Sequence, residues 1–185
     1  TLDLTIIQIV FDKGKLRPGE LSTSGNPALG GIDMDDRLIG YLINKAHLEE
    51  MQSDPNFMSK LQERVEQAKI DLSMNPGKPS TDISIGKRPK ITLTQEELEH
   101  TLKPLREQCR TPIEEALEKA GLPAKDLDHI LFVGGPTQMP CVRRVVMGEL
   151  ARLGARKELI SQMREIYEGE LLVNPMECVA RGAAL

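Results

Sequence analysis

The sequence has few aromatic residues, few cysteines and no long apolar segment. Tryptophan is absent, and aromatic residues make up only 3% of the 185 positions. Base-stacking platforms for nucleic acids and stacking faces for carbohydrates both need aromatic rings, so this composition argues against either ligand class. The longest apolar stretches, such as residues 130–133, are far shorter than the ~20 residues of a membrane helix. No secretory signal pattern is present. We therefore expect neither nucleic acid nor membrane among the partners.

No charge sign dominates, and the cysteines form no pattern. The 24 basic and 28 acidic residues give a net charge of −4, which does not suit the broad basic surface of nonspecific nucleic-acid binding. Cys109, Cys141 and Cys178 contain no C-x-x-C pair and are too scattered for a metal cage. This usage suits a reducing compartment, so we expect a cytoplasmic protein with buried, unreactive thiols and no metal-ligating residues.

Length and composition favour a folded globular protein. The 185 residues correspond to one domain, or one domain with an inserted subdomain, and can bury a core without disulfides. The 39% hydrophobic and 28% charged residues are typical of soluble globular proteins. The chain opens on Thr1 directly into a strand-like run, which indicates a piece of something longer.

Strand patterns occur near both ends of the chain. Residues 4–10 are rich in β-branched apolar residues, which predicts a buried strand, and residues 12–15 predict a hairpin turn after it. Residues 129–133 are an uninterrupted apolar run, typical of a strand covered on both faces. We expect residues 4–10 and 130–133 to lie in one sheet.

Helical patterns fill the middle. A capping side chain marks each expected helix start: Asp35 or Asp36, Asp54, residues 94–97 and residues 111–114. Residues 75–79 and Gly121 are expected helix ends, and residues 83–85 and 91–93 are two short strands. The pattern predicts an α/β fold in which residues 1–29 and 111–185 form a sheet-containing subdomain, with residues 30–110 as an inserted α+β subdomain.

Local chemistry is sparse. Gly134 and Gly135 follow a predicted strand, where glycines allow a ligand close to the backbone, although a tight turn needs glycine as well. No P-loop or Rossmann motif occurs. His47, His100 and His129 lie in separate elements, and we interpret them as surface or structural residues.

Four segments resemble motifs of the seventy-kilodalton heat-shock chaperones of the DnaK type, in the family's order. Residues 29–38 (LGGIDMDDRL) resemble its Leu-Gly-Gly-x-Asp-x-Asp-x-Arg-Leu segment, and residues 66–73 (EQAKIDLS) resemble its adenosine-contacting helix. Residues 130–140 (ILFVGGPTQMP) resemble its adenosine loop, and residues 174–184 (NPMECVARGAA) its closing helix. Residues 1–4 resemble the end of its second phosphate motif.

The resemblance implies an actin-like ATPase lobe, with a ribonuclease-H-like sheet and flanking helices, that binds ATP or ADP. Magnesium would be held mainly through the phosphates and the other lobe. Thr1 would face the terminal phosphate and the attacking water as the catalytic residue. The implied cofactor-binding residues are Gly30, Gly31, Glu66, Lys69, Ile70, Ser73, Gly134, Gly135, Pro136, Gln138, Met139 and Met176. Glu66, Lys69 and Ser73 share one helix face; the alternative interpretation is a solvated surface.

Four positions depart from the family's usual residues. Glu is common at Ile32, Ser at Pro136, Arg at Gln138 and Asp at Met176. Glutamine cannot stack a charged guanidinium on adenine, and proline removes a backbone donor. The chain thus resembles a divergent member.

The implied function is that of an ATP-binding lobe in a chaperone that couples ATP binding and hydrolysis to protein folding. A nucleotide-exchange factor on the inserted subdomain, a J-domain co-chaperone and unfolded clients are the implied partners. The catalytic lysine and an aspartate belong to the other lobe, so we expect no ATP hydrolysis by this chain alone. Two alternatives are a degenerate regulatory or interaction module of the same fold, and another actin-fold ATPase such as a sugar kinase or filament protein.

Overall fold

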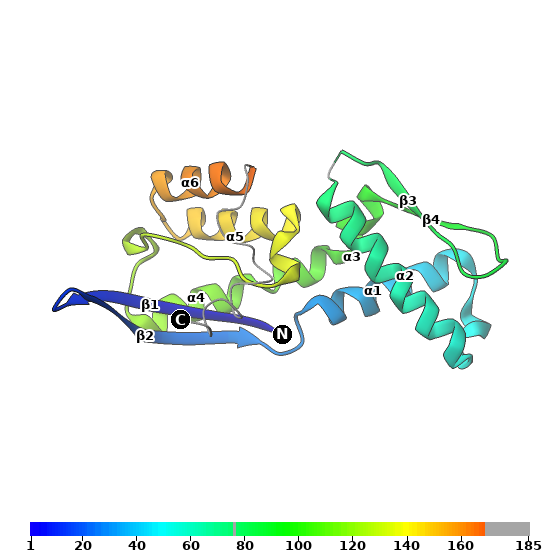
Figure 1. Ribbon diagram of the computed structural model, residues 1–185, viewed down its shortest axis with the longest axis horizontal. Helices are drawn as coiled ribbons and strands as arrows, with labels where there is room; N and C mark the ends of the chain where they lie inside the picture. Colours follow the sequence, from blue (N-terminus) through cyan, green and yellow to red (C-terminus); the bar gives the residue numbers. More distant parts are fainter. Residues whose placement is uncertain (76, 169–185) are drawn as a thin grey trace.

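A computed structural model describes residues 1–75 and 77–168 (Figure 1). The elements are β1 (Leu2–Asp12), β2 (Lys15–Asn26), α1 (Gly31–Ala46), the 3-10 helix η1 (Glu49–Ser53), α2 (Pro55–Met74), β3 (Ser80–Ile83), β4 (Ile91–Thr94), α3 (Gln95–Glu107), α4 (Arg110–Ala120), the 3-10 helices η2 (Ala124–Asp126) and η3 (Gly135–Gln138), α5 (Pro140–Arg152) and α6 (Lys157–Glu168). The molecule is elongated, with β1, β2, α4, α5 and α6 towards one end and α1, α2, β3 and β4 towards the other. Within the described residues, no helix is long and apolar enough to cross a membrane.

β1 and β2 form an antiparallel hairpin, which confirms the strand and the turn predicted near the start of the chain. The register runs from Leu2 opposite Asn26 to Asp12 opposite Lys15. The turn residues Lys13 and Gly14 have positive φ values of 50° and 77°. The hairpin end projects beyond α4 in Figure 1.

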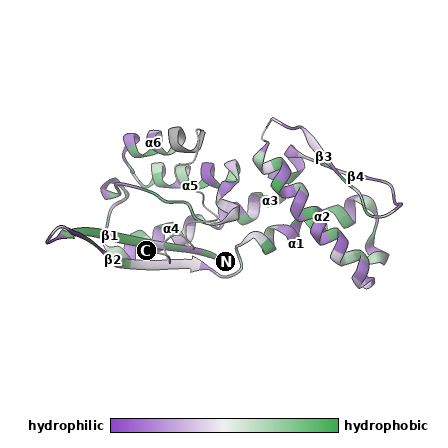
Figure 2. Cartoon of the chain, in the orientation of Figure 1, coloured by the Kyte–Doolittle hydropathy of each residue, from purple (hydrophilic) through white to green (hydrophobic). Residues whose placement is uncertain are grey.

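The outer half of β1 is exposed, so the fully buried strand expected for residues 4–10 is wrong. Leu4 and Ile6 pack against buried residues, whereas Ile7 and Ile9 are 54% and 65% exposed. Figure 2 shows hydrophobic colouring along most of β1, so hydropathy does not distinguish its two halves. The difference arises because the helices cover only the inner part of the hairpin.

Residues 130–133 form no strand, so the predicted sheet containing them and residues 4–10 is wrong. Among the described residues, β1 pairs with β2 and with no other strand. Leu131 is 67% exposed, while Phe132 is buried. An apolar run becomes a strand only where a neighbouring strand satisfies its backbone N–H and C=O groups.

The larger apolar core lies among α1, α2, α3 and the β3–β4 hairpin. Helical spacing along α2 places Leu61, Val65 and Leu72 inside the core, all without solvent exposure. Asp54 caps α2 as predicted, since its carboxylate accepts hydrogen bonds from the N–H groups of Asn56 and Phe57 at 2.9 and 3.2 Å. β3 and β4 pair antiparallel, with β3 over residues 80–83 rather than the expected 83–85.

Of the two predicted capping boxes, one is confirmed and one is wrong. The Thr94 hydroxyl accepts from the Glu97 N–H at 3.1 Å, and the Glu97 carboxylate accepts from the Thr94 N–H at 2.9 Å. The box expected over residues 111–114 does not form, because the backbone is already helical at Cys109 and α4 begins at Arg110. Gly121, with φ of 64°, ends α4 as predicted.

A second, smaller core lies between the inner half of the hairpin, α4 and α5, and it contains one acidic side chain. Glu149 is fully buried. Its Oε2 lies 2.9 Å from Arg110 Nη1, and its Oε1 accepts from Arg152 Nε at 2.9 Å. The hydrogen bond from Arg152 is the largest cause that lowers the pKa of Glu149. The ion pair between Glu149 of α5 and Arg110 of α4 therefore links these two helices.

The prediction of buried, unreactive thiols is confirmed for two cysteines. Cys109 and Cys141 are free and 3% exposed. Burial raises the pKa of Cys109 to about 11 and raises that of Cys141 as well, so both remain protonated thiols near neutral pH. Cys178 lies outside the described residues.

We predict that Glu149→Gln lowers the free energy of unfolding by about 1–3 kcal/mol at pH 7, because two arginines lose their buried anionic partner. The folded-state pKa of Glu149 lies below its ordinary value of 4.5. The stabilisation is therefore present above that value and lost as the pH falls through the folded pKa. Urea unfolding at pH 7 and at pH 3 should show the gap between wild type and variant shrinking in acid.

Glu118→Gln, at an exposed position on the same helix as Arg110, is the matched control and should change stability little at either pH. An equal gap for Glu149→Gln at both pH values would contradict the prediction.

Candidate functional site

The start of α1 contains two glycines that other segments approach closely. The Gly30 N–H donates to Asp33 Oδ2 at 2.6 Å, so Asp33 caps the helix and the expectation of Asp35 or Asp36 is wrong. Those two residues lie too far into the helix to reach its first N–H groups. A Cβ on Gly30 would stand 2.4 Å from the backbone nitrogen of Thr1. Glycine at this position therefore lets Thr1 lie against the helix start.

Lys69 of α2 reaches the same helix start, where it pairs with Asp35. The ammonium nitrogen lies 2.8 Å from Oδ1 and 2.9 Å from Oδ2 of Asp35, and it donates to the Gly31 carbonyl at 3.3 Å. The Lys69 and Asp35 side chains are only 10% and 8% exposed. Burial raises the pKa of Asp35, and the hydrogen bond from Lys69 opposes that rise. Because the two charges compensate each other, the pair can form hydrogen bonds with a ligand but adds little net charge to the site.

The other predicted residues of α2 divide between its buried and exposed sides. Ser73 is buried, and its hydroxyl donates to the Lys69 carbonyl at 2.6 Å. Glu66 is exposed, and Ile70 is 44% exposed. The alternative of a fully solvated face for Glu66, Lys69 and Ser73 is therefore wrong for the last two.

The turn after residue 133 approaches this helix start from another direction. Gly134 has φ of +92°, a conformation that strains residues with a side chain. The Thr137 hydroxyl donates to the Gly134 carbonyl at 2.6 Å and closes the turn. A Cβ on Gly31 would lie 3.5 Å from Pro136 Cγ and 3.7 Å from Lys69 Nζ. The turn, the start of α1 and Lys69 thus meet around Gly31.

The remaining residues of the turn differ in their surroundings. Gly135 and Gln138 are half-buried, and Met139 is buried in the larger apolar core. Neither Gln138 nor Glu66 uses its side chain in a hydrogen bond within the described part of the chain, so both retain donors or acceptors for a ligand. Met176 lies outside the described residues.

The structure therefore gathers residues from four of the motifs that the sequence analysis singled out. They are Thr1, Gly30, Gly31, Lys69 and Pro136. Sequence reasoning gave Asp33 no role and gave Asp35 only that of a possible helix cap, whereas Asp33 caps the helix and Asp35 holds the lysine. An acidic residue in the first turn of a helix is a sequence signal for helix capping, the role of Asp33. No local signal reveals the pairing of Asp35 with Lys69, because 34 positions separate these residues.

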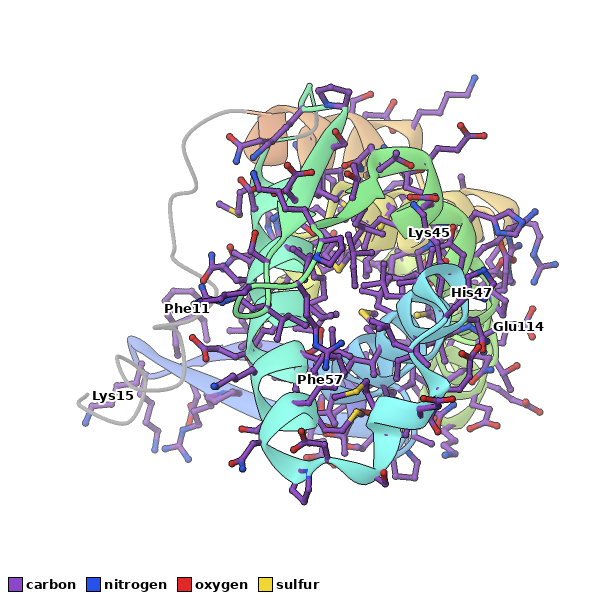
Figure 3. The ribbon with its side chains drawn as sticks, turned by 90° about the vertical axis from the view of Figure 1, so that its right-hand side faces the viewer. Phe11, Lys15, Lys45, His47, Phe57 and Glu114 are labelled. Atoms are coloured by element: carbon purple, nitrogen blue, oxygen red, sulfur yellow. The ribbon has the colours of Figure 1, made fainter. Side chains whose placement is uncertain are left out.

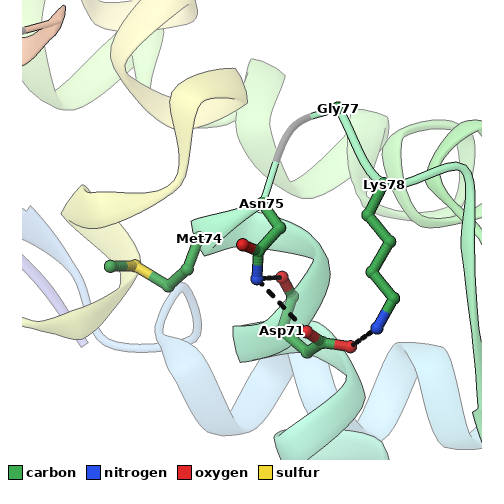
Figure 4. Close-up of a pocket in the computed structure, with 5 residues that line it drawn as sticks. All are labelled: Asp71, Met74, Asn75, Gly77 and Lys78. Carbon is green, nitrogen blue, oxygen red and sulfur yellow. Dashed lines mark hydrogen bonds and ion pairs between the residues drawn. The ribbon is translucent and has the colours of Figure 1, made fainter.

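A cavity of about 610 Å³ lies at the C-terminal end of α2 and is lined by Asp71, Met74, Asn75, Gly77 and Lys78 (Figure 4). The Asp71 carboxylate, which lines this cavity, accepts hydrogen bonds from Lys78 Nζ at 2.5 Å and from Asn75 Nδ2 at 3.2 Å. The hydrogen bond from Lys78 is the largest cause that lowers the pKa of Asp71. Met74, which also lines this cavity, leaves α2 on the side away from Lys78 in Figure 4.

The groups around Gly31 are hydrogen-bond donors and acceptors together with glycine backbone. Gly31 is partly exposed at the start of α1, and the exposed Glu66 and the half-buried Gln138 have polar side chains that a ligand can reach. In the described ranges 1–75 and 77–168, no group of three or more His, Cys, Asp or Glu residues could hold a metal ion.

Comparisons with known proteins show the family of this chain. The family model described as Hsp70 protein matches residues 1–185. The chain is 33% identical to the chaperone protein DnaK of Methanothermobacter thermautotrophicus, 36% identical to that of Thermoplasma volcanium and 34% identical to that of Nitrosopumilus maritimus. Each match covers 100% of this chain but only 28–29% of the relative. Because a whole-chain family match accompanies identity above 30%, this chain belongs to the Hsp70 family of DnaK-type chaperones.

Proposed function

We propose that this chain is the second lobe of the nucleotide-binding domain of a DnaK-type chaperone and contacts ATP or ADP around Gly31. The observation that carries the proposal is the meeting of Gly31, Lys69 and Pro136, which come from three separate nucleotide motifs. Residues 31 and 136 are more than a hundred positions apart, so no local turn explains their contact. In this proposal the chain contributes to ATP-driven protein folding in a cytoplasmic parent protein.

The proposed roles follow from position. Thr1, Gly30 and Gly31 lie against the phosphates, with Thr1 facing the terminal phosphate and the water that attacks it. Glu66, Lys69 and Ser73 contact the ribose and base from α2, with Ile70 alongside, whereas Gly134, Gly135, Pro136 and Gln138 lie on the opposite side. Met139 packs in the larger apolar core beneath the turn. Met176 is proposed to contact the nucleotide on the same side as the turn. Bound Mg²⁺ would neutralise charge on the phosphates during transfer.

The inserted subdomain is proposed to span residues 30–110, with residues 1–29 and 111–185 forming the other subdomain. Two separate groups of buried apolar residues support this division. Met139 and Cys141 join the larger group, so the two units share a packed boundary. A nucleotide-exchange factor on the inserted subdomain, a J-domain co-chaperone and unfolded clients are the partners proposed for the parent protein.

A degenerate, non-catalytic interaction module is the second candidate. It is favoured by Asp35, which already neutralises Lys69, and by Pro136 and Gln138 in place of the family's usual serine and arginine. Titrating the parent protein with Mg²⁺–ADP separates the two candidates, because the module would not bind.

We predict that Lys69→Met combined with Asp35→Asn weakens ADP binding by the parent protein. Changing both residues leaves no buried, unpaired charge, so the fold should survive. Loss of a charged hydrogen bond costs about 1.5–3 kcal/mol, or roughly 10- to 150-fold in affinity. Isothermal calorimetry measures the change. Lys78→Met removes a lysine paired with Asp71 and should leave affinity unchanged; equal affinities for all three proteins would refute the role of Lys69.

We predict that Gln138→Arg tightens nucleotide binding, because a guanidinium can stack on the base. The expected gain is about 0.5–2 kcal/mol, or a few-fold to thirty-fold. Gln138→Met, which has similar size and no charge, should give no gain. If arginine and methionine have the same effect in calorimetry, Gln138 does not face the base.

We predict that residues 1–185 alone release no phosphate from Mg²⁺–ATP above a blank. Phosphoryl transfer needs positioned cations around the phosphates, and the proposed catalytic lysine lies in another lobe. Circular dichroism of the same sample establishes that the chain is folded. Magnesium-dependent turnover by this folded chain would contradict the proposal.

A further inference from the structure

A second cavity, of about 480 Å³, opens at the C-terminal end of α1, at the opposite end of that helix from Gly31. Since α1 has 16 residues, it is about 24 Å long. The cavity is therefore separate from the nucleotide site. Figure 3 looks onto this end of the molecule and labels Lys45 of α1 and Phe57 of α2, which both line the cavity.

The floor of the cavity is apolar and well packed. Phe57 comes from α2, Ile83 from β3 and Ile91 from β4, and Ile85 comes from the loop between these strands. Their exposed fractions are all 9% or less. An apolar floor built from three elements suits a ring or a branched aliphatic group.

Three cationic side chains line the cavity, and two of them are already neutralised. Lys45 Nζ lies 2.6 Å from Glu97 Oε1, and Lys90 Nζ lies 3.4 Å from Asp82 Oδ2. Arg88 is different, because its Nη2 lies 3.3 Å from Met51 Sδ and no carboxylate pairs with it within the described residues. Its guanidinium stands over the Phe57 ring, 5.5 Å from the centroid.

The Lys45 pair is firmly held, so it does not contribute a free charge. Glu97 also accepts hydrogen bonds from the Tyr41 hydroxyl at 2.7 Å and from the Thr94 N–H at 2.9 Å. These bonds and Lys45 lower the pKa of Glu97 to about 2 against the effect of burial, while burial and the Glu97 carboxylate raise the pKa of Tyr41 to about 12. The cavity is thus left with one uncompensated positive charge, on Arg88, beside an apolar floor.

We propose that this cavity binds a small amphipathic monoanion, in which one carboxylate or sulfonate pairs with Arg88 and an apolar body covers Phe57, Ile83 and Ile91. The volume lies within the range of about 300–1,000 Å³ typical of small-molecule sites. One uncompensated cation favours one negative charge over the several charges of a nucleotide. The Arg88 guanidinium lies over the Phe57 ring, and a planar guanidinium can bind a carboxylate through two N–H groups.

The test uses the full 185-residue chain, labelled with ¹⁵N, and 3-phenylpropionate as the probe. Amide shifts should change around residues 83–92 and near Phe57, with saturation in the micromolar to low millimolar range. The neutral amide 3-phenylpropionamide should bind at least five-fold more weakly. Shifts centred elsewhere, or equal binding of acid and amide, would overturn the proposal.

Two variants test the role of the cation. Arg88→Gln should weaken 3-phenylpropionate binding at least five-fold, whereas Lys87→Gln, which removes a neighbouring exposed charge outside the cavity, should not. Unchanged binding by Arg88→Gln with a well-dispersed spectrum would overturn the proposal. So would tighter binding of an acetylated Glu-Phe-Glu peptide than of the free acid, because the natural occupant would then be a protein segment.

Discussion

The ion pair between Lys69 and Asp35 joins α2 to the start of α1 at the proposed nucleotide site. Both charges are withdrawn from water, and each offsets the desolvation cost of the other. The same ammonium also binds the Gly31 carbonyl, so it fixes the first turn of α1 relative to α2. Removing either partner alone would leave a charge with no water around it, which makes the pair a structural unit as well as part of the site.

The start of α1 also depends on positions that have no side chain. Any Cβ at Gly30 would collide with Thr1, and one at Gly31 would fill the space beside Pro136 and Lys69. The close approach of Thr1 thus depends on Gly30, whereas a Cβ at Gly31 would make contacts of ordinary van der Waals length. An aspartate two positions later completes the helix start by accepting the Gly30 N–H.

The two ends of α1 have opposite electrostatic characters. At its N-terminal end, a lysine is neutralised by a buried aspartate, so a ligand there meets hydrogen-bonding groups and bare backbone. At its C-terminal end, Arg88 keeps its charge beside an apolar floor. The first environment suits a polar ligand held by many contacts, and the second suits a single charge attached to an apolar body.

Local signals in the sequence determined much of the secondary structure and the family. The turn before Lys15, the Asp54 cap and the Thr94 capping box each involve groups within four positions of one another, so short-range chemistry suffices. The family motifs also indicated Lys69 and Gly31, but only the tertiary structure decided that they meet and that Asp35 holds the lysine. It also decided that residues 130–133 form no strand and that the outer half of β1 is exposed. Strand pairing, burial and ion pairing depend on which distant segments become neighbours, and no local pattern contains that information.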